Sequence, residues 1–391
     1  MSSSPFGSPS PFGYPRALFD PNYIPPKLLH RNKELKNFLN IFNSSLNPED
    51  KFNINAYIYG IRGIGKSVFT KYFLRLLKSH FGEKFTDIYI DMAVKSPNEN
   101  LRLLVELYSQ SISNKFTYLN NPQKLWSYFH FLRNKTEIPL ILILDNVNYL
   151  NQPLFEKIIR YSKDLKISTI VTSQIPYRTC KKNSNLIAEY LDFPLKLDIY
   201  SSSALLDILS QRIALAFPMN IDTTLSQYIV DIVTQFDLYR PSTCITVLKT
   251  IYQHLINGED VHPTLIRNIS FHLLEFPFQG DLNSLLQFDD STIELFYLPL
   301  LEKIAIFFKK GKQVYIDSKE LFRLYKITCD ELLLPYNKNQ YQKFIDILVF
   351  DGFLYQSGFK SVNDEPLFFI MIDPHRLLEY LEIKYSAISD E

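Results

Sequence analysis

The chain has few cysteines, no excess charge of one sign and no long hydrophobic run, and each shortage excludes a class of protein. Cys180, Cys244 and Cys329 lie far apart and form no C-x-x-C pair, which argues against a zinc ribbon or a disulfide framework. No apolar stretch approaches the ~18 residues that span a bilayer, and the N-terminus lacks the pattern of a signal peptide. We therefore expect a cytoplasmic protein that does not enter the membrane.

The charges are nearly balanced, with 42 Lys and Arg against 41 Asp and Glu and a formal net charge of +1. Such a balance gives no chain-wide signature of nucleic-acid binding, so any basic surface must be local. With 391 residues the chain is long enough for two or three domains. Its 31 Phe and 25 Tyr residues fall mainly in apolar-periodic segments, which favours core packing over base stacking.

The most informative segment is the run from Tyr57 to Ser67, where an apolar strand leads directly into G-x-x-x-x-G-K-S and a helical pattern follows. Glycines let backbone N–H groups turn toward phosphate oxygens, Lys66 reaches the β- and γ-phosphates, and the Ser67 hydroxyl completes Mg²⁺ coordination. We expect this loop to hold ATP or ADP with Mg²⁺. The expected nucleotide contacts are Gly60, Ile61, Arg62, Gly63, Ile64, Gly65, Lys66, Ser67 and Val68.

A second acidic contact to the metal is expected at the end of a buried strand, and Asp145 ends the apolar run 139–145. Hydrolysing members of this broad class generally have Glu next, whereas this chain has Asn146. An amide cannot accept a proton at neutral pH, and base catalysis contributes ~10²–10⁴-fold, so we expect weak ATPase activity at most. Gln174 is the candidate γ-phosphate sensor, and Arg240 is the candidate arginine clamp. The alternatives are a capping Asp145, a strand-terminal turn at Gln174 and a solvated Arg240.

Strand patterns at 87–91, 139–145 and 167–173 alternate with helical ones, which predicts an α/β fold with a parallel sheet covered by helices on both faces. After about residue 200 three amphipathic helices follow. From 291 onward, helices followed by a two-stranded ribbon are typical of a winged helix. We predict a flexible tail (1–24), a nucleotide-binding α/β domain (25–197), a helical lid (198–275), a linker (276–290) and a winged-helix domain (291–391).

The order of these landmarks resembles the archaeal replication initiators of the origin-recognition-complex type. The matching segments are Asn22–Arg31, the Gly60–Ser67 loop, Ile199–Arg212 and Leu298–Lys303, and the resemblance spans roughly residues 20 to 385. It implies an AAA+ P-loop ATPase core with a helical lid and a C-terminal winged helix that act on origin DNA during DNA replication. It also implies that the region from Pro25 to Arg31, with Leu29 and His30, lies close to the adenine. Tyr200, Arg212 and Arg240 are the other expected nucleotide contacts.

Three departures from the family pattern bear on function. The acidic pair Asp-Glu of the family is Asp145-Asn146 here, and the segment Asn183–Leu186 lacks the expected arginine finger. Both departures argue against multimer-coupled hydrolysis. From residue 285 onward there are 12 Lys and Arg against 17 Asp and Glu, a balance of −5. An acidic winged helix is a poor general binder of the phosphate backbone.

The leading hypothesis is an ATP- or ADP-binding replication initiator, or an initiator paralogue, that recognises duplex DNA and associates with the nucleoid. A nucleotide-stabilised interaction protein that binds a paralogous initiator, a helicase or another replisome protein is the second interpretation. A P-loop ATPase of signalling or chaperone type is the third. The candidate DNA contacts are Lys115, which the resemblance places in a DNA-contacting insertion, and Lys309, Lys310, Lys312, Lys338, Gln340, Gln342, Lys343 and Lys360.

Overall fold

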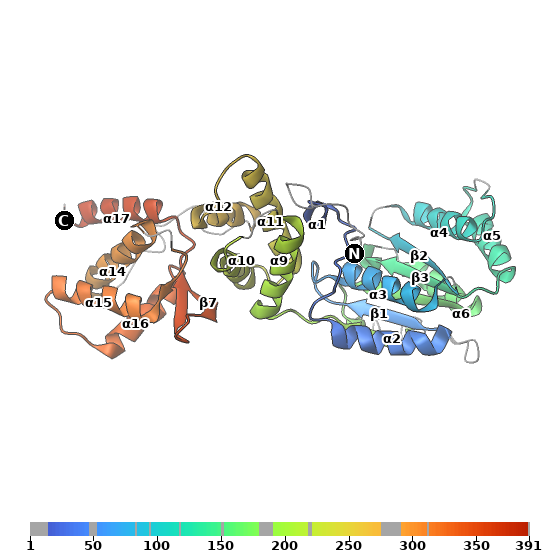
Figure 1. Ribbon diagram of the computed structural model, residues 1–391, viewed down its shortest axis with the longest axis horizontal. Helices are drawn as coiled ribbons and strands as arrows, with labels where there is room; N and C mark the ends of the chain where they lie inside the picture. The colour runs from blue at the N-terminus through green and yellow to red at the C-terminus, as the bar shows by residue number, and fades with distance from the viewer. Residues whose placement is uncertain are drawn as a thin grey trace, which may run out of the picture. The chain divides into compact units, whose positions relative to one another are not determined.

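The computed structural model separates into two compact units, which we call the α/β unit and the C-terminal unit (Figure 1). The α/β unit is Asp20–Tyr200 with Arg240–Ser242, and the C-terminal unit is Met1–Phe19, Ser201–Tyr239 and Thr243–Glu391. The structure describes residues 15–46, 53–82, 84–93, 95–116, 119–149, 152–179, 191–217, 221–274, 291–310 and 313–389. The predicted linker 276–290, the segment 183–186 and Lys312 lie outside the described residues.

The α/β unit is built on a five-stranded parallel sheet in the order β2-β3-β4-β1-β5. Every residue of β3 and β4 is buried, as expected for central strands with near-continuous apolar sequences. The predicted parallel sheet is therefore confirmed. The strands are β1 (Asn55–Tyr59), β2 (Thr86–Asp91), β3 (Leu140–Asp145), β4 (Ile167–Ser173) and β5 (Phe193–Lys196).

Helices cover both faces of this sheet, and β2 shows how one strand serves the two faces. Ile88 and Ile90 join a buried cluster with side chains of α4, α5 and α6. Tyr89 points to the other face, where the Lys71 Nζ of α3 lies 4.6 Å from the centre of its ring. The helices are α2 (Asn32–Leu46), α3 (Lys66–Phe81), α4 (Pro97–Ser111), α5 (Pro122–Asn134) and α6 (Gln152–Asp164), with a short 3₁₀ turn η1 (Val147–Tyr149).

The first part of the C-terminal unit is helical, and its described residues form five helices where the sequence indicated three. The short helix α1 (Arg16–Phe19) packs on α9, and Ala17 and Leu18 are buried. The prediction of a flexible tail is wrong for these residues, because two apolar side chains find a surface that the local Ser/Pro-rich composition did not indicate. The other helices are α9 (Ser202–Ala216), α10 (Thr223–Phe236), α11 (Pro241–Ile256) and α12 (Pro263–Leu273).

The last part of the C-terminal unit combines helices with a three-stranded antiparallel sheet in the order β6-β8-β7, which fits a winged-helix domain. A buried cluster that includes Leu301, Tyr325 and Leu348 forms its core. The elements are α14 (Ser291–Lys310), β6 (Ile316–Asp317), α15 (Ser318–Glu331), α16 (Lys338–Phe350), β7 (Tyr355–Lys360), β8 (Pro366–Phe369) and α17 (Pro374–Ser389).

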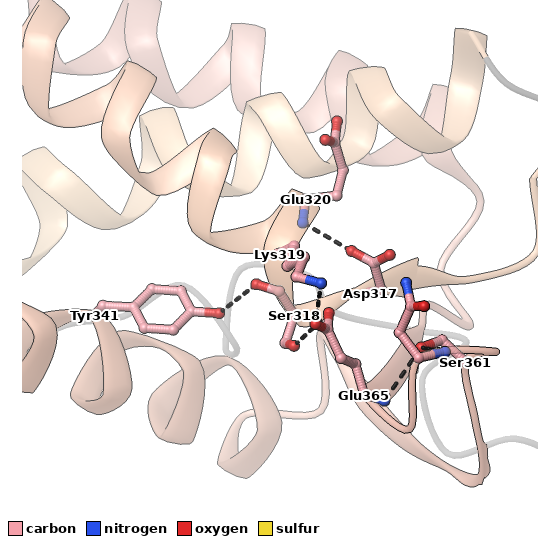
Figure 2. A network of polar contacts seen from close by, with 8 residues as sticks. Asp317, Ser318, Lys319, Glu320, Tyr341, Ser361 and Glu365 are labelled. Atoms are coloured by element: carbon pink, nitrogen blue, oxygen red, sulfur yellow. Dashed lines mark hydrogen bonds and ion pairs between the residues drawn. The ribbon is translucent and has the colours of Figure 1, made fainter.

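A polar network ties the β7–β8 connection to the start of α15 (Figure 2). Glu365 accepts a hydrogen bond from Ser318 Oγ at 3.3 Å and forms an ion pair with Lys319 at 2.5 Å. Tyr341 of α16 donates to the carbonyl of Ser318 at 3.2 Å. The network links the ribbon to α15 and α16, and it pairs the Lys319 ammonium with the Glu365 carboxylate.

Candidate nucleotide site

The phosphate loop connects β1 to α3, and two of its glycines adopt left-handed backbone conformations. Gly63 has φ +79° and Gly65, the residue before α3, has φ +98°. A side chain is disfavoured at such angles, whereas glycine adopts them at no steric cost. Ile64 between them is fully buried and anchors the loop. The loop thus follows the predicted course from strand to helix N-terminus, where backbone N–H groups can bind phosphate.

Lys66, the first residue of α3, folds back over the loop. Its Nζ donates to the carbonyls of Gly60 and Ile61 at 2.8 and 2.9 Å. Burial lowers the pKa of Lys66 to about 8, while the nearby Asp145 carboxylate acts in the opposite direction. A partly desolvated ammonium held inside the loop is suited to binding phosphate oxygens, which are stronger acceptors than backbone carbonyls.

Asp145 ends β3 and is almost fully buried, and two hydroxyls donate to its carboxylate. Tyr89 of β2 donates to Oδ2, and Thr172 of β4 donates to Oδ1. Burial raises the pKa of the Tyr89 phenol, and the charge of Asp145 raises it further, so this hydroxyl stays protonated and donates. A hydrogen bond with Ser67 acts on the same phenol in the opposite direction. Tyr89 therefore lies between Ser67 and Asp145, the two residues predicted to bind Mg²⁺.

The oxygen atoms of Ser67 and Asp145 are suitable ligands for Mg²⁺. A hydroxyl from Ser67 and a carboxylate from Asp145 are hard ligands of the kind this ion prefers, and each carboxylate oxygen has a second lone pair beside the one engaged. Within the described residues no cluster of three or more His, Cys, Asp or Glu side chains forms a closed metal cage. Mg²⁺ in nucleotide sites is generally held by one or two protein oxygens together with waters and phosphates, and these residues match that pattern.

Asn146 follows β3 with φ +59°, in the left-handed region that asparagine tolerates better than most residues. Its backbone N–H donates to Thr172 Oγ1 at 3.0 Å. Its side-chain Nδ2 donates to Asp91 Oδ1 at 3.0 Å, which joins the carboxyl ends of β3 and β2. The amide at this position is thus fixed by a neighbouring carboxylate.

Arg240 and Ser242 lie against the phosphate loop, although they belong to the segment that begins α11. The backbone N–H of Ser242 donates to the Gly63 carbonyl at 3.4 Å. A Cβ placed on Gly63 would lie 2.1 Å from Ser242 Oγ and 3.4 Å from Arg240 Cδ. The candidate clamp Arg240 is therefore brought to the loop. Gln174 follows β4, and its N–H donates to Asn148 Oδ1 at 3.4 Å.

The segment expected near the adenine lies along α3. Arg75 of α3 donates to the carbonyl of Pro25 at 2.7 Å, and Pro25 is buried. Arg31 is also buried, but its donors go to Tyr200 Oη, Glu34 and the Asp198 carbonyl, and its guanidinium lies 4.0 Å from the centre of the Tyr200 ring.

The pairing of Arg31 with Tyr200 joins the two ends of the α/β unit. Leu29 is half-buried, and His30 is exposed with φ +56°. In the C-terminal unit, Arg212 donates to the carbonyl of Ala17 at 2.8 Å. Arg31 and Arg212 thus make internal contacts that local sequence did not reveal, and their nucleotide roles remain predictions.

Sequence reasoning missed Tyr89 and Asp91 as part of this site. Both come from β2, a strand whose position was predicted, and the available signal was that they alternate with Ile88 and Ile90 along it. Residues i and i+2 of a strand share a face, so Tyr89 and Asp91 face the same side, and parallel pairing aligns Asp91 with Asp145. Recognising them required knowing that β2 lies beside β3.

The candidate DNA residues are exposed where the structure describes them. On α16 the residues Gln340, Gln342 and Lys343 face solvent, while Ile345 and Leu348 are buried, as the helical pattern predicts. Gln342 Nε2 donates to Asp346 at 2.9 Å, and Lys360 pairs with Asp364 at 2.9 Å. The other described members, all exposed, are Lys115, Lys309, Lys310 and Lys338.

Comparisons with known proteins agree with the resemblance in sequence. The chain is 27% identical over 217 residues to the ORC1-type DNA replication protein 1 of Sulfurisphaera tokodaii and 29% identical over 213 residues to that of Sulfolobus acidocaldarius. The matches cover 52% and 51% of this chain, which spans about half the length of these curated relatives. No family model matches the chain.

The similarity in fold extends over nearly the whole chain. Cdc6p from Pyrobaculum aerophilum has a TM-score of 0.76 at 19% identity, over 95% of this chain and 98% of that one. The Aeropyrum pernix ORC1 protein in complex with DNA gives 0.58 at 16% identity, over 95% and 97%. The Aeropyrum pernix ORC2 protein, solved as ADPNP-ADP complexes, gives 0.54 at 18% identity, over 97% and 100%. The chain therefore has the AAA+ fold of the archaeal ORC and Cdc6 proteins. Within the part of the chain that the structure describes, no helix is long and apolar enough to cross a membrane.

Proposed function

We propose that this protein is a nucleotide-binding replication initiator of the archaeal origin-recognition type, or a paralogue of one, that recognises duplex DNA in the cytoplasm and associates with the nucleoid. The observation that carries the proposal is the phosphate loop, with Lys66 folded over it, Asp145 beside Lys66, and Arg240–Ser242 against Gly63. Loop, ammonium, carboxylate and guanidinium are the groups that an Mg²⁺-nucleotide requires.

Nucleotide binding in the proposal draws on local geometry and on one solved relative. When nucleotide is bound, Mg²⁺ would be held by Ser67 and Asp145 and would neutralise charge on the phosphates. In our proposal Lys66 turns from the carbonyls of Gly60 and Ile61 to the β- and γ-phosphates, and Arg240 adds a second positive charge. The structure of Aeropyrum pernix ORC2 with ADPNP and ADP supports a nucleotide role for this fold.

Duplex DNA as the partner is supported by the DNA complex of Aeropyrum pernix ORC1 and by the helices and ribbon of the C-terminal part. We propose that α16 enters the major groove with Gln340, Gln342 and Lys343 outward, while Lys309, Lys310 and Lys338 contact phosphates. In the α/β unit, Lys115 would add a backbone contact.

The nucleotide part is tested by calorimetry with ADP and ATP on the purified full chain and on Lys66→Ala. We expect measurable affinity in the native chain and its loss in the variant, because the charge that pairs with the phosphates is gone. Exposed Lys36 on α2 provides the control, and Lys36→Ala should bind as the native chain does. Equal affinity in Lys66→Ala and the native chain would exclude this site.

The DNA part is tested by footprinting on chromosomal fragments at stated salt, which measures binding and site choice together. Protection of defined sites that survives competing random duplex supports the initiator role. Nucleotide binding without any DNA binding at low salt would leave the site in place and exclude duplex DNA as the partner.

One observation favours the second function, a nucleotide-stabilised protein that binds a paralogue or helicase. The connection between α15 and α16 exposes Leu333 at 93%, Leu334 at 47% and Tyr336 at 54%. Adjacent exposed apolar side chains are typical of protein contacts, and they accompany a segment whose net charge is negative. Leu333→Asp with Leu334→Asp should then weaken a complex with a purified paralogue in sedimentation velocity while leaving nucleotide affinity unchanged.

A further inference from the structure

Asp91 is a carboxylate at the carboxyl end of β2, next to the position where a hydrolysing site needs one. The register pairs Asp91 with Asp145, so both acidic residues end neighbouring parallel strands at the same edge of the sheet. Tyr89, two residues earlier, faces the same side as Asp91 and contacts Asp145. Asp91 thus belongs to the face of the sheet that α3 and the phosphate loop cover.

The contact with Asn146 fixes where this carboxylate lies. Asn146 Nδ2 donates to Asp91 Oδ1 at 3.0 Å, and the Ala93 N–H donates to the same oxygen at 3.0 Å. Among the described residues, these are the hydrogen bonds to the carboxylate, so its Oδ2 keeps its lone pairs for a water. The Asp91 charge also contributes to the raised pKa of Tyr89, as expected if the two groups are close. A carboxylate and an amide therefore form a pair in which the acid is on β2 and the amide follows β3.

We propose that Asp91 is the general base of ATP hydrolysis in this protein, with Asn146 orienting the water. In the proposed step a water bound beside the pair, with Asn146 Oδ1 as its second acceptor, gives a proton to Asp91 Oδ2 while its oxygen bonds to the γ-phosphorus. The bond from that phosphorus to the β–γ bridging oxygen breaks, and its electron pair leaves with ADP. The products are ADP and phosphate, and the proton passes from Asp91 to solvent. This inference rests on the proposed ATP site.

The pair also explains why Asn146 is not a defect of the site. A glutamate after Asp145 would bring a second carboxylate against Asp91, and two like charges at hydrogen-bond distance cannot both be ionised at neutral pH without a large cost. An amide avoids this repulsion and donates a hydrogen bond that keeps Asp91 in place. In this proposal the neighbouring strand β2 supplies the carboxylate that is absent from the position after Asp145.

The test is single-turnover hydrolysis of ATP by the full chain, with Lys66→Ala as the blank and ADP affinity measured in parallel. Asp91→Asn should lower the rate about 100-fold or more, because base catalysis is lost, while ADP affinity changes little. Asp87→Asn is the matched control, since Asp87 lies on the same face of the same strand and pairs with Lys78 at 2.7 Å. Its rate should equal that of the native chain.

The exchange variant Asp91→Asn with Asn146→Asp keeps both the hydrogen bond and the net charge, and it returns a carboxylate to the edge. Its hydrolysis rate should be at least about tenfold higher than that of Asp91→Asn. A purely structural role of Asp91 would not explain this recovery. An Asp91→Asn rate equal to the native rate would overturn the proposal, and so would a native chain that binds ATP but hydrolyses it no faster than the blank. Absence of nucleotide binding in the native chain would instead overturn the proposed function.

Discussion

The backbone N–H of Gly358 donates to the carboxylate of Asp231 at 2.8 Å and links β7 to α10 within the C-terminal unit. Tyr315 and Ser357 donate to the same carboxylate at 2.6 and 2.5 Å, so three donors converge on one buried acid. Tyr228 of α10 adds a hydrogen bond to the Ile370 carbonyl at 3.1 Å. This cluster joins the helical part of the unit to its winged-helix part.

Asp231→Ala should destabilise the C-terminal unit strongly. The buried Ser357 hydroxyl and the partly buried donors of Tyr315 and Gly358 would lose their acceptor. An unsatisfied buried group costs roughly 1–3 kcal/mol, so we expect a loss of about 2 kcal/mol or more. Thermal unfolding followed by circular dichroism measures the effect. Asp260→Ala, at an exposed aspartate before α12, is the control and should change the unfolding temperature little. Equal stabilities of the two variants would show that the cluster does not hold the unit together.

The stability contributed by Asp231 should depend on pH in the direction opposite to that of a salt-bridged acid. Burial raises the pKa of Asp231, despite the hydrogen bonds from Ser357 and Tyr315. The folded state then holds its proton to a higher pH than the unfolded state, whose Asp has a pKa of about 3.9. Stability from this group is therefore present below that value and is lost as pH rises through the folded pKa.

Asp231→Asn removes this titration, so the stability difference between the native chain and Asp231→Asn should grow as the pH falls from neutral toward 4. Urea unfolding at several pH values measures that difference, and charges shared by both proteins cancel in it. A difference that shrinks on acidification would mean that the folded carboxylate is stabilised in its charged form.

The close contact between Gly63 and Ser242 predicts a specific effect of a methyl group. Gly63→Ala introduces both the backbone strain of φ +79° and an overlap with Ser242 Oγ, whereas Gly82→Ala introduces strain at φ +58° with no atom within 4 Å. Strain alone costs about 1–2 kcal/mol. We expect Gly63→Ala to lose more stability than Gly82→Ala, and to lose ADP affinity in calorimetry while Gly82→Ala keeps it. Matching losses in both variants would remove the inferred role of the Ser242 contact.

The sequence allowed the prediction of much of the fold because its signals were local. The run of five apolar residues before Asp145 can only be a buried strand or a short buried helix. The phosphate loop, which joins a strand to a helix, favoured the strand and with it an α/β fold. Helix α16 also reflects local signals, since Asn337 caps its first turn and the buried residues Ile345 and Leu348 repeat at helical spacing.

What was not predicted depends on contacts between distant residues. Arg31 bonds Tyr200 across 169 positions, and Asn146 meets Asp91 across 55. Local sequence pattern and propensity do not reveal such partners, because the pairing of distant residues depends on strand order and register. Helix α1 was missed for a related reason: its four residues have a weak helical signal by themselves, and burial of Ala17 and Leu18 depends on the surface of α9.

The last prediction concerns α16 and separates base recognition from phosphate contact. Gln342 and Lys343 lie on its exposed face, and glutamine and lysine side chains read base edges at ~1–3 kcal/mol of discrimination for each good pair. Because Gln342 Nε2 is bonded to Asp346, its Oε1 is the atom presented to a base unless that bond is released.

Gln342→Ala with Lys343→Ala should weaken binding to a footprinted site more than binding to random duplex. Lys309→Ala with Lys310→Ala should weaken both equally and reduce the salt slope by about 1 for each lysine that contacts phosphate. Anisotropy titrations between 50 and 200 mM salt, about the range over which phosphate contacts dominate, measure both quantities, with Lys36→Ala as the control. Equal losses on both duplexes for the Gln342 and Lys343 pair would exclude base reading by α16.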